Sequence, residues 1–224
     1  MTIKDLVRPL PGVRQLSIFR QRVDFSGSTS FWEENYRSGE LSGPGSYGIL
    51  ADAKAQFLNT FVRENRVCSI VEFGCGDGNQ LSMAEYPRYV GLDVSRSAIA
   101  LCRRRFSPDP AKSFFLYDGE AFVDRAGLFS SDLAMSLDVV YHLVEDAVFE
   151  IYMTQLFAAG QRYVIVYSSD TEMRGTAPHV RHRRFTRWVE ENCPEWRLAN
   201  VTRGPNEEPG RADFFVYERS VAQD

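Results

Sequence analysis

Three closely spaced glycines follow a short apolar segment and form the most distinctive pattern in this sequence. The segment VEFGCGDGNQ, residues 71–80, places Gly74, Gly76 and Gly78 directly after the apolar run at 68–73. Glycine lets the backbone turn tightly and lets a ligand approach main-chain N–H groups without a Cβ in the way. Glu72 precedes the first glycine by two positions. The pattern therefore predicts a small-ligand site at the end of a buried strand.

An acidic residue closes the next apolar segment. Asp93 lies at the end of YVGLDV, residues 89–94, roughly 20 positions after the first glycine. A carboxylate in that place can accept hydrogen bonds from two ribose hydroxyls. The dinucleotide-binding pattern is GxGxxG, whereas this loop reads GxGxG, so its third glycine comes one position early. The spacing indicates a ligand with a ribose and counts against a nicotinamide cofactor.

The histidines of this chain lie late in the sequence, where they can serve as general bases. His142 follows the apolar segment at 132–140, and His179 and His182 lie in TAPHVRHRRF. Histidine titrates near neutral pH, so a proton can pass to it from a hydroxyl or amine. We take all three as candidate catalytic residues. The alternative for His142 is a loop side chain that only packs on the ligand. The alternative for His179 and His182 is a solvated basic loop.

Arginines are concentrated between residues 174 and 187, although the chain as a whole is mildly acidic. Arg174, Arg181 and Arg183 are candidates to bind an anionic substrate, because guanidinium groups suit carboxylate and phosphate. A solvated helix start is the alternative interpretation. The aromatic residues Trp32 and Tyr36, together with Tyr141, are candidates for a substrate pocket or for simple packing.

Hydrophobic periodicity predicts the elements that position these residues. Strands are predicted at 68–73, 89–94, 113–118, within 132–140, and at 162–169, 196–203 and 212–219. Helices are predicted at 31–36, 47–65, 79–84, 97–105, 146–157 and 185–191. Strands that alternate with helices predict a Rossmann-like, doubly wound α/β fold with helices on both faces of the sheet. We expect seven mostly parallel strands, with the last strand antiparallel because a short loop joins it to the strand before.

Length and composition limit the class of protein. The 224 residues, with 44% hydrophobic and 25% charged side chains, suit one domain with an addition. We divide the chain into an N-terminal arm or lid at 1–46 and a main domain at 47–224. The net charge of −4 does not favour a nucleic-acid binder. The start of the chain lacks a signal-peptide pattern, so we expect a cytoplasmic protein that does not contact membranes. The cysteines lack metal-ligand spacing, so we expect no metal. We also expect a monomer or homodimer.

The motifs together resemble those of the class I S-adenosylmethionine-dependent methyltransferases, over roughly residues 47–218. The matching pieces are EFGCGDG, GLDVS at the second strand, YDGE after the third and SLDVVYHL around the fourth. The segment SGPGSYG, residues 42–48, also resembles a bacterial small-molecule branch of that family. The resemblance implies the cofactor S-adenosylmethionine, the product S-adenosylhomocysteine, and a set of cofactor-binding residues. That set is Tyr47, Glu72, Gly74, Cys75, Gly76, Asp77, Gly78, Gln80, Asp93, Val94, Ser95, Asp118, Gly119, Glu120, Leu137, Asp138 and His142.

The expected activity is methyl transfer to an oxygen or nitrogen of a small molecule, anionic if the arginines bind it, such as a sugar, nucleotide-sugar or secondary metabolite. A nucleic-acid methyltransferase of the same fold is the first alternative. SLDVVYH lacks the NPPY-like segment of amino-directed enzymes, and Cys193 does not follow a proline as the cytosine-directed kind requires. The other alternative functions are a nicotinamide-dependent oxidoreductase and a non-catalytic binding module.

Overall fold

The computed structural model describes residues 25–173, 175, 177–206 and 211–220. Its α-helices are α1 (Ser28–Arg37), α2 (Gly48–Glu64), α3 (Arg96–Arg105), α4 (Asp146–Ala159) and α5 (Phe185–Asn192). Its strands are β1 (Ile70–Phe73), β2 (Tyr89–Asp93), β3 (Lys112–Leu116), β4 (Ser131–Leu137), β5 (Gly160–Ser168), β6 (Trp196–Thr202) and β7 (Asp213–Arg219). Short 3-10 turns are η1 (Pro44–Ser46), η2 (Gln80–Met83) and η3 (Val140–His142).

The strands form one seven-stranded sheet in the order β3-β2-β1-β4-β5-β7-β6. The pairs from β3 to β5 are parallel, and β7 is antiparallel to both β5 and β6. This confirms the predicted Rossmann-like sheet with an inverted last strand. Chain order changes direction between β1 and β4, which is the place where such sheets bind ligands at the carboxyl ends of their strands.

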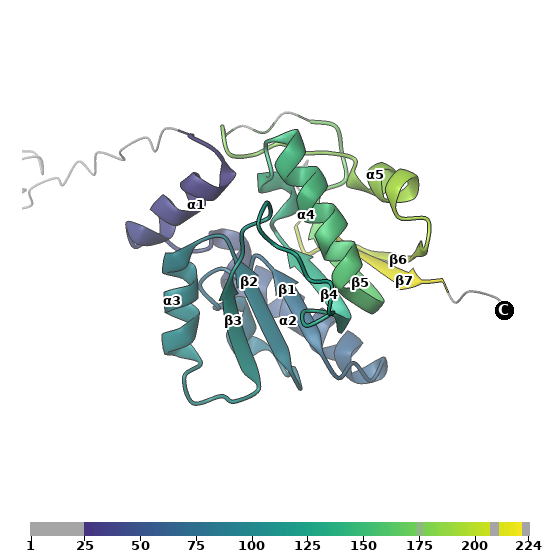
Figure 1. The fold of residues 1–224 in the computed structure, drawn as a ribbon, viewed down its shortest axis with the longest axis horizontal. Coiled ribbons are helices and arrows are strands. Elements are labelled where there is room, and N and C mark those ends of the chain that lie inside the picture. Colours follow the sequence, from purple (N-terminus) through teal and green to yellow (C-terminus); the bar gives the residue numbers. More distant parts are fainter. Residues whose placement is uncertain (1–24, 174, 176, 207–210, 221–224) are drawn as a thin grey trace, which may run out of the picture.

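Helices cover both faces of the sheet (Figure 1). On one face, α2 and α3 bury Leu58, Val62 and Ile99 with side chains of β1, β4 and β5. On the other face, α4 and α5 bury Phe157 and Phe185 among others in a second cluster. All four residues of β1 are buried in the middle of the parallel sheet, which explains why three of them are apolar, and Glu72 is the exception.

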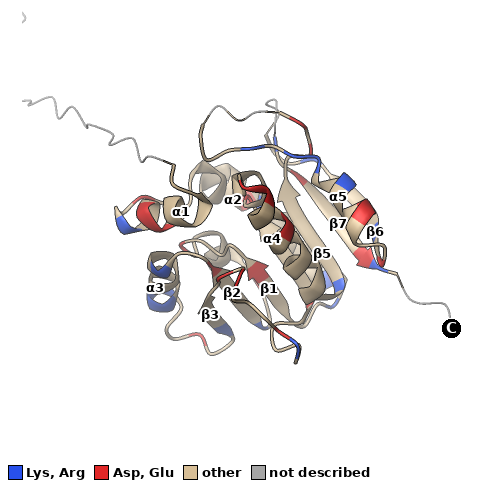
Figure 2. Ribbon diagram, turned by 45° about the horizontal axis from the view of Figure 1, so that its top comes forward, with Lys and Arg blue, Asp and Glu red and all other residues tan. Residues whose placement is uncertain are grey.

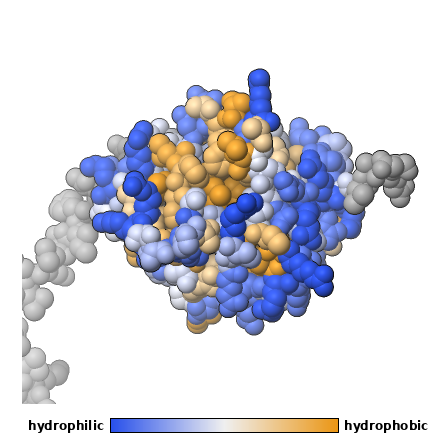
Figure 3. Space-filling view, turned by 60° about the horizontal axis from the view of Figure 1, so that its bottom comes forward, coloured by the Kyte–Doolittle hydropathy of each residue, from blue (hydrophilic) through white to orange (hydrophobic). Residues whose placement is uncertain are grey.

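One predicted helix is shorter than expected. Residues 79–84 form only the 3-10 turn η2, because Pro87 follows closely and leaves too little chain for two helical turns. The other predicted elements are present within a few residues of their predicted ends. Charged residues are coloured along α3 and α5, and acidic residues lie near the ends of β1 and β2 (Figure 2). One face of the molecule gathers apolar side chains within a hydrophilic surround (Figure 3).

Candidate functional site

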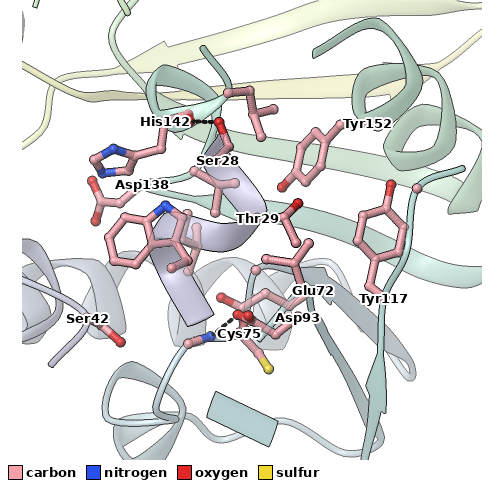
Figure 4. Close-up of a pocket in the computed structure, with 18 of the residues that line it drawn as sticks. Ser28, Thr29, Ser42, Glu72, Cys75, Asp93, Tyr117, Asp138, His142 and Tyr152 are labelled. Carbon is pink, nitrogen blue, oxygen red and sulfur yellow. Dashed lines mark hydrogen bonds between the residues drawn. The ribbon is translucent and has the colours of Figure 1, made fainter. Parts of the chain in front are cut away.

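A cavity of about 230 Å³ opens at the carboxyl ends of β1, β2 and β4, with residues of α1 on its opposite side. Figure 4 shows side chains from distant parts of the chain pointing into it, among them Ser28, Glu72, Asp93 and Asp138. Most of the residues that the sequence predicts to bind a cofactor line this cavity. They are Glu72, Gly74, Cys75, Gly76, Asp77, Gln80, Asp93, Val94, Asp118, Gly119, Glu120, Leu137, Asp138 and His142.

The glycine loop turns in the left-handed region of backbone space. Gly74, Gly76 and Gly78 have φ angles of +83°, +57° and +74°, which favour glycine over any residue with a Cβ. The main-chain N–H groups of Gly74 and Cys75 both donate to the Leu92 oxygen, at 2.7 and 3.0 Å. The loop is therefore held against the end of β2, as its sequence pattern predicts.

Asp93 joins the end of β2 to the glycine loop. Its Oδ2 accepts a hydrogen bond from the Gly76 N–H and its Oδ1 accepts one from the Ser95 N–H, each at 2.8 Å. Burial raises the pKa of Asp93 to about 6, although both main-chain N–H groups lower it. A carboxylate has room for further hydrogen bonds at each oxygen. Asp93 can thus accept ribose hydroxyls while it holds the loop.

Glu72 lies in the middle of β1 with its carboxyl at the cavity. The side chain is 5% exposed, and its Oε2 accepts a hydrogen bond from the Tyr89 hydroxyl at 2.5 Å. Burial is the main cause that raises the pKa of Glu72 to about 7, while Tyr89 and the charge of Lys54 act in the opposite direction. Its charge in the ligand-free protein therefore changes close to neutral pH.

Lys54 is a cavity residue that the sequence analysis missed. The side chain is 1% exposed, and its Nζ donates to Asp138 Oδ2 at 2.5 Å. The second oxygen of Asp138 accepts a hydrogen bond from the Tyr141 hydroxyl at 2.8 Å. The sequence pattern could have identified Lys54 as a buried lysine, because it falls on the same helical face as Ala51 and Leu58, which are also buried.

The segment SGPGSYG at 42–48 lies on the outer side of the glycine loop. Its Ser42 N–H donates to Asp77 Oδ2 at 3.1 Å, and the Tyr47 hydroxyl donates to the same oxygen at 2.6 Å. A Cβ built on Gly76 would come within 2.5 Å of Ser42 Oγ and 3.0 Å of the Tyr36 hydroxyl. The need for glycine at position 76 thus arises from the N-terminal segment as well as from the loop's own turn.

Helix α1 is attached on both sides of the cavity. At its start, Ser28 Oγ donates to Glu145 Oε2 at 2.5 Å. In its middle, Glu33 accepts hydrogen bonds from the hydroxyls of Ser95 and Ser97, at 2.7 and 2.8 Å. Tyr36 and Trp32 of this helix line the cavity, and their role in binding a substrate stays a prediction.

The three candidate histidines lie in one region, and only His142 lines the cavity. Its Nδ1 is 2.9 Å from the His179 main-chain oxygen, and its ring meets the Trp32 ring edge-on with centroids 4.8 Å apart. Burial lowers the pKa of His142 to about 4. The His179 ring stacks on Phe31 at 4.2 Å, and His182 Nδ1 lies 2.6 Å from Ser169 Oγ.

Arg181 and Arg183 of the basic stretch are paired within the protein. Arg183 donates to Asp146 at 2.6 Å and to the Val144 main-chain oxygen at 2.8 Å. Arg181 lies 3.1 Å from the same Asp146 carboxylate and donates to the Val144 oxygen. Both therefore hold the turn before α4 and neither lines the cavity. Arg174 lies outside the described residues. The binding of an anionic acceptor by these arginines stays a prediction.

Four further predicted residues do not line the cavity: Tyr47, Gly78, Ser95 and Tyr141. Each is next in the chain to a residue that does. No group of three or more His, Cys, Asp or Glu side chains is placed to hold a metal ion within the described part of the chain. Metal-free chemistry stays a prediction. No helix among the described residues is long and apolar enough to span a membrane.

Comparison with known proteins identifies the domain that contains the cavity. The sequence profile described as "Methyltransferase domain" matches residues 71–155, from the glycine loop to α4. This chain carries a class I S-adenosylmethionine-dependent methyltransferase domain. The resemblance found in the sequence is thereby confirmed at the level of the family.

Two solved methyltransferase structures share the fold of this domain. The N-methyltransferase NodS from Bradyrhizobium japonicum, solved with S-adenosylhomocysteine, gives a TM-score of 0.68 at 12% identity and covers 86% of this chain and 98% of its own. The methyltransferase domain of bacterial CtHen1-C gives a TM-score of 0.59 at 19% identity, and the match covers 75% of this chain and 98% of its own.

One curated relative is a small RNA 2'-O-methyltransferase from Arabidopsis thaliana. It is 24% identical over 163 residues, which are 66% of this chain. The chain spans only 17% of the length of that relative. The relatives therefore include methyltransferases with different acceptors.

The residues of the methyltransferase cavity fit S-adenosylmethionine. Asp93 provides acceptors for the ribose hydroxyls, and the positive φ of Gly74 keeps the cavity wall free of a Cβ. A Cβ on Gly74 would come within 2.4 Å of Val139 Cγ2, a side chain that also lines the cavity. Apolar Leu137 and Ile151 add surface suited to the adenine and the sulfonium methyl.

Proposed function

We propose that this methyltransferase transfers a methyl group from S-adenosylmethionine to an oxygen or nitrogen atom of a small-molecule acceptor. The position of α1 carries the proposal. Ser28 fixes the start of this helix to Glu145, and Glu33 fixes its middle to the start of α3. An acceptor therefore reaches the cavity beside Trp32 and Tyr36 under a helix, rather than from an open surface.

The charge of the cavity supports a small molecule over an RNA. Among the described residues that line it, Lys54 is the only lysine or arginine, and its ammonium is already paired with Asp138. Six acidic side chains line the same cavity: Glu72, Asp77, Asp93, Asp118, Glu120 and Asp138. Nucleic-acid sites are basic, because phosphate binding dominates their affinity. We therefore favour the small-molecule acceptor, although an RNA methyltransferase is among the relatives.

The bound cofactor supplies a methyl group on an already activated sulfonium, so the protein mainly orients the acceptor and excludes water. His142 is the side chain we propose to accept the acceptor's proton. A carbonyl oxygen can only accept a hydrogen bond, so the His179 oxygen fixes the proton of His142 on Nδ1 and leaves Nε2 free. Within the predicted arm at 1–46, α1 is the part that covers the cavity, and residues 1–24 lie outside the described residues.

Release of S-adenosylhomocysteine with defined acceptors tests the proposal. The full chain is supplied with S-adenosylmethionine and with amines, phenols and sugar hydroxyls, each in a neutral and a phosphorylated or carboxylated form. A parallel reaction contains a short RNA duplex and its matched 2'-deoxy-ended control. We expect turnover with a small molecule and none that depends on the RNA. RNA-dependent turnover that exceeds every small molecule would contradict the proposal. A cytoplasmic location and a monomeric or homodimeric state stay predictions of the sequence analysis.

A further inference from the structure

Among the described residues that line the cavity, Lys54 is the only lysine or arginine, and the sequence analysis did not predict it as a site residue. Lys54 lies on α2, with its ammonium group between the carboxyl ends of β1 and β4. It is 1% exposed, its Nζ is 2.5 Å from Asp138 Oδ2, and it lies 5.2 Å from the centre of the Tyr167 ring. Burying an ion pair costs desolvation energy that its own attraction often fails to recover. A functional reason for this pair is therefore worth seeking.

The partner of Lys54 is held in an unusual backbone conformation. Asp138 has a φ of +60°, which non-glycine residues rarely adopt and which is commonly found at functional sites. Tyr141 donates to Oδ1, and a Cβ on Gly45 would come within 2.8 Å of Oδ2. The carboxylate is thus fixed in direction at the cavity, next to Leu137 and Val139, which also line it.

A polar group without a partner lies close to the same helix. Gln80 lines the cavity, and its Nε2 donates to the Ala51 main-chain oxygen on α2 at 3.1 Å. Its Oε1 is buried and has no hydrogen-bond partner among the described residues. A buried oxygen of this kind is normally satisfied by a donor. A ligand that brings an N–H donor to this part of the cavity would satisfy it.

The methionine end of the cofactor carries one ammonium and one carboxylate group on the same carbon. We infer that Lys54 binds the α-carboxylate of S-adenosylmethionine, while Asp138 and Gln80 accept hydrogen bonds from its α-ammonium. In the complex, Lys54 contacts the cofactor's carboxylate and Asp138 contacts its ammonium. These two contacts between opposite charges replace the ion pair between Lys54 and Asp138. Lysine is suited to this exchange because its ammonium carries three donors. Lys54 alone provides a positive charge among the described cavity residues, so it selects for the carboxylate.

This inference rests on the proposed function only in its choice of cofactor, and a binding experiment separates the two. Calorimetry measures the Kd of S-adenosylhomocysteine and of its decarboxylated analogue, in which hydrogen replaces the carboxylate. The comparison is made in the unaltered protein and in Lys54→Met. Because the two ligands differ only in the carboxylate, the ratio of their Kd values isolates the contact in question.

We expect the unaltered protein to bind S-adenosylhomocysteine about 10- to 100-fold more tightly than the decarboxylated analogue, as for a hydrogen bond between charged groups. Lys54→Met should bring that ratio to within about threefold of one. The matched control is Lys112→Met, because Lys112 pairs with Asp109 and does not line the cavity. It should leave the ratio unchanged.

A second variant guards against loss of folding. Lys54→Met leaves Asp138 as an unpaired buried charge, whereas Lys54→Met combined with Asp138→Asn removes both charges. The ratio of the two Kd values should also fall towards one in this double variant. A ratio that stays as in the unaltered protein, or an unaltered protein that does not distinguish the two ligands, would overturn the inference. Failure of both ligands to bind the unaltered protein would instead overturn the cofactor assignment itself.

Discussion

The carboxylate of Asp93 accepts a hydrogen bond from the main-chain N–H of Gly76 at 2.8 Å, and this contact joins the end of β2 to the glycine loop. The sequence predicts the two residues separately, Asp93 as a ribose acceptor and Gly76 as part of a tight turn that a ligand can approach. The structure makes them one unit, so a change at Asp93 acts on both halves of the cofactor site.

Replacement of Asp93 should weaken the cofactor site strongly. Asp93→Ala removes an acceptor of ribose hydrogen bonds and also the anchor of Gly76, so we expect the Kd of S-adenosylhomocysteine to rise at least tenfold, since hydrogen bonds to charged groups contribute about 1.5–3 kcal/mol each. Isothermal titration calorimetry measures the change. Asp109→Ala is the control, because Asp109 pairs with Lys112 away from the cavity. Unchanged affinity in Asp93→Ala would show that this carboxylate does not hold the ribose.

Glu72 should make the ligand-free protein less stable as the pH rises. Burial raises its folded-state pKa to about 7, above its ordinary value near 4.3, so the folded protein holds the proton more tightly than the unfolded chain. The contribution of Glu72 to the free energy of unfolding is then full below about pH 4.3 and is lost as the pH rises to about 7, a change of about 2–4 kcal/mol.

Urea unfolding at pH 5 and pH 8 measures this effect as a difference between the unaltered protein and Glu72→Gln. The comparison is needed because the pKa of His142 is lowered to about 4, so that residue destabilises the fold as the pH falls. The gain in stability of Glu72→Gln over the unaltered protein should be larger at pH 8 than at pH 5. An equal difference at the two pH values would show that Glu72 does not titrate in this range.

His142 should affect turnover more than cofactor binding. We expect His142→Ala to lower kcat by about 10²–10⁴ if Nε2 accepts the proton of the acceptor, with the Kd of S-adenosylhomocysteine changed less than threefold. Since burial lowers its pKa to about 4, protonation of His142 should not reduce kcat between pH 8 and pH 6. Steady-state kinetics over this range check both points. A kcat within about threefold of the unaltered enzyme would leave His142 with a packing role.

Arg183 should contribute to stability through the turn before α4. Its side chain is 11% exposed and donates to two main-chain oxygens and to Asp146. Arg183→Ala should lower the free energy of unfolding by about 1–3 kcal/mol, because the Leu143 oxygen loses its donor and the Val144 oxygen keeps only Arg181. The exposed Arg187, paired with Glu191 at 2.8 Å, is the matched control, and its replacement by Ala should cost less than about 0.5 kcal/mol.

The acceptor's charge decides whether Arg183 has a second role. If the acceptor is anionic, Arg181→Ala and Arg183→Ala should each raise its KM while the affinity for the cofactor stays the same. An equal effect on charged and neutral acceptors would assign both arginines to the turn alone.

The sequence by itself determined the sheet, the glycine loop and Asp93. These features follow from local patterns, because apolar periodicity distinguishes strands from helices and the left-handed turns at Gly74 and Gly76 require glycine within a few residues. The alternation of strands and helices then predicts a mostly parallel sheet, because parallel strands need crossover connections and the helices supply them. The same local logic placed Asp93 at the end of β2.

Only the tertiary structure decided the partners of the charged side chains. Lys54 meets Asp138 across 84 positions, and Ser28 meets Glu145 across 117. The sequence indicates a charge but not the distant group that neutralises it, since long-range contacts depend on how the helices pack on the sheet. For that reason Arg181 and Arg183, which were expected at the ligand, hold the turn before α4, and Lys54, a lysine in an ordinary helical pattern, lines the cavity.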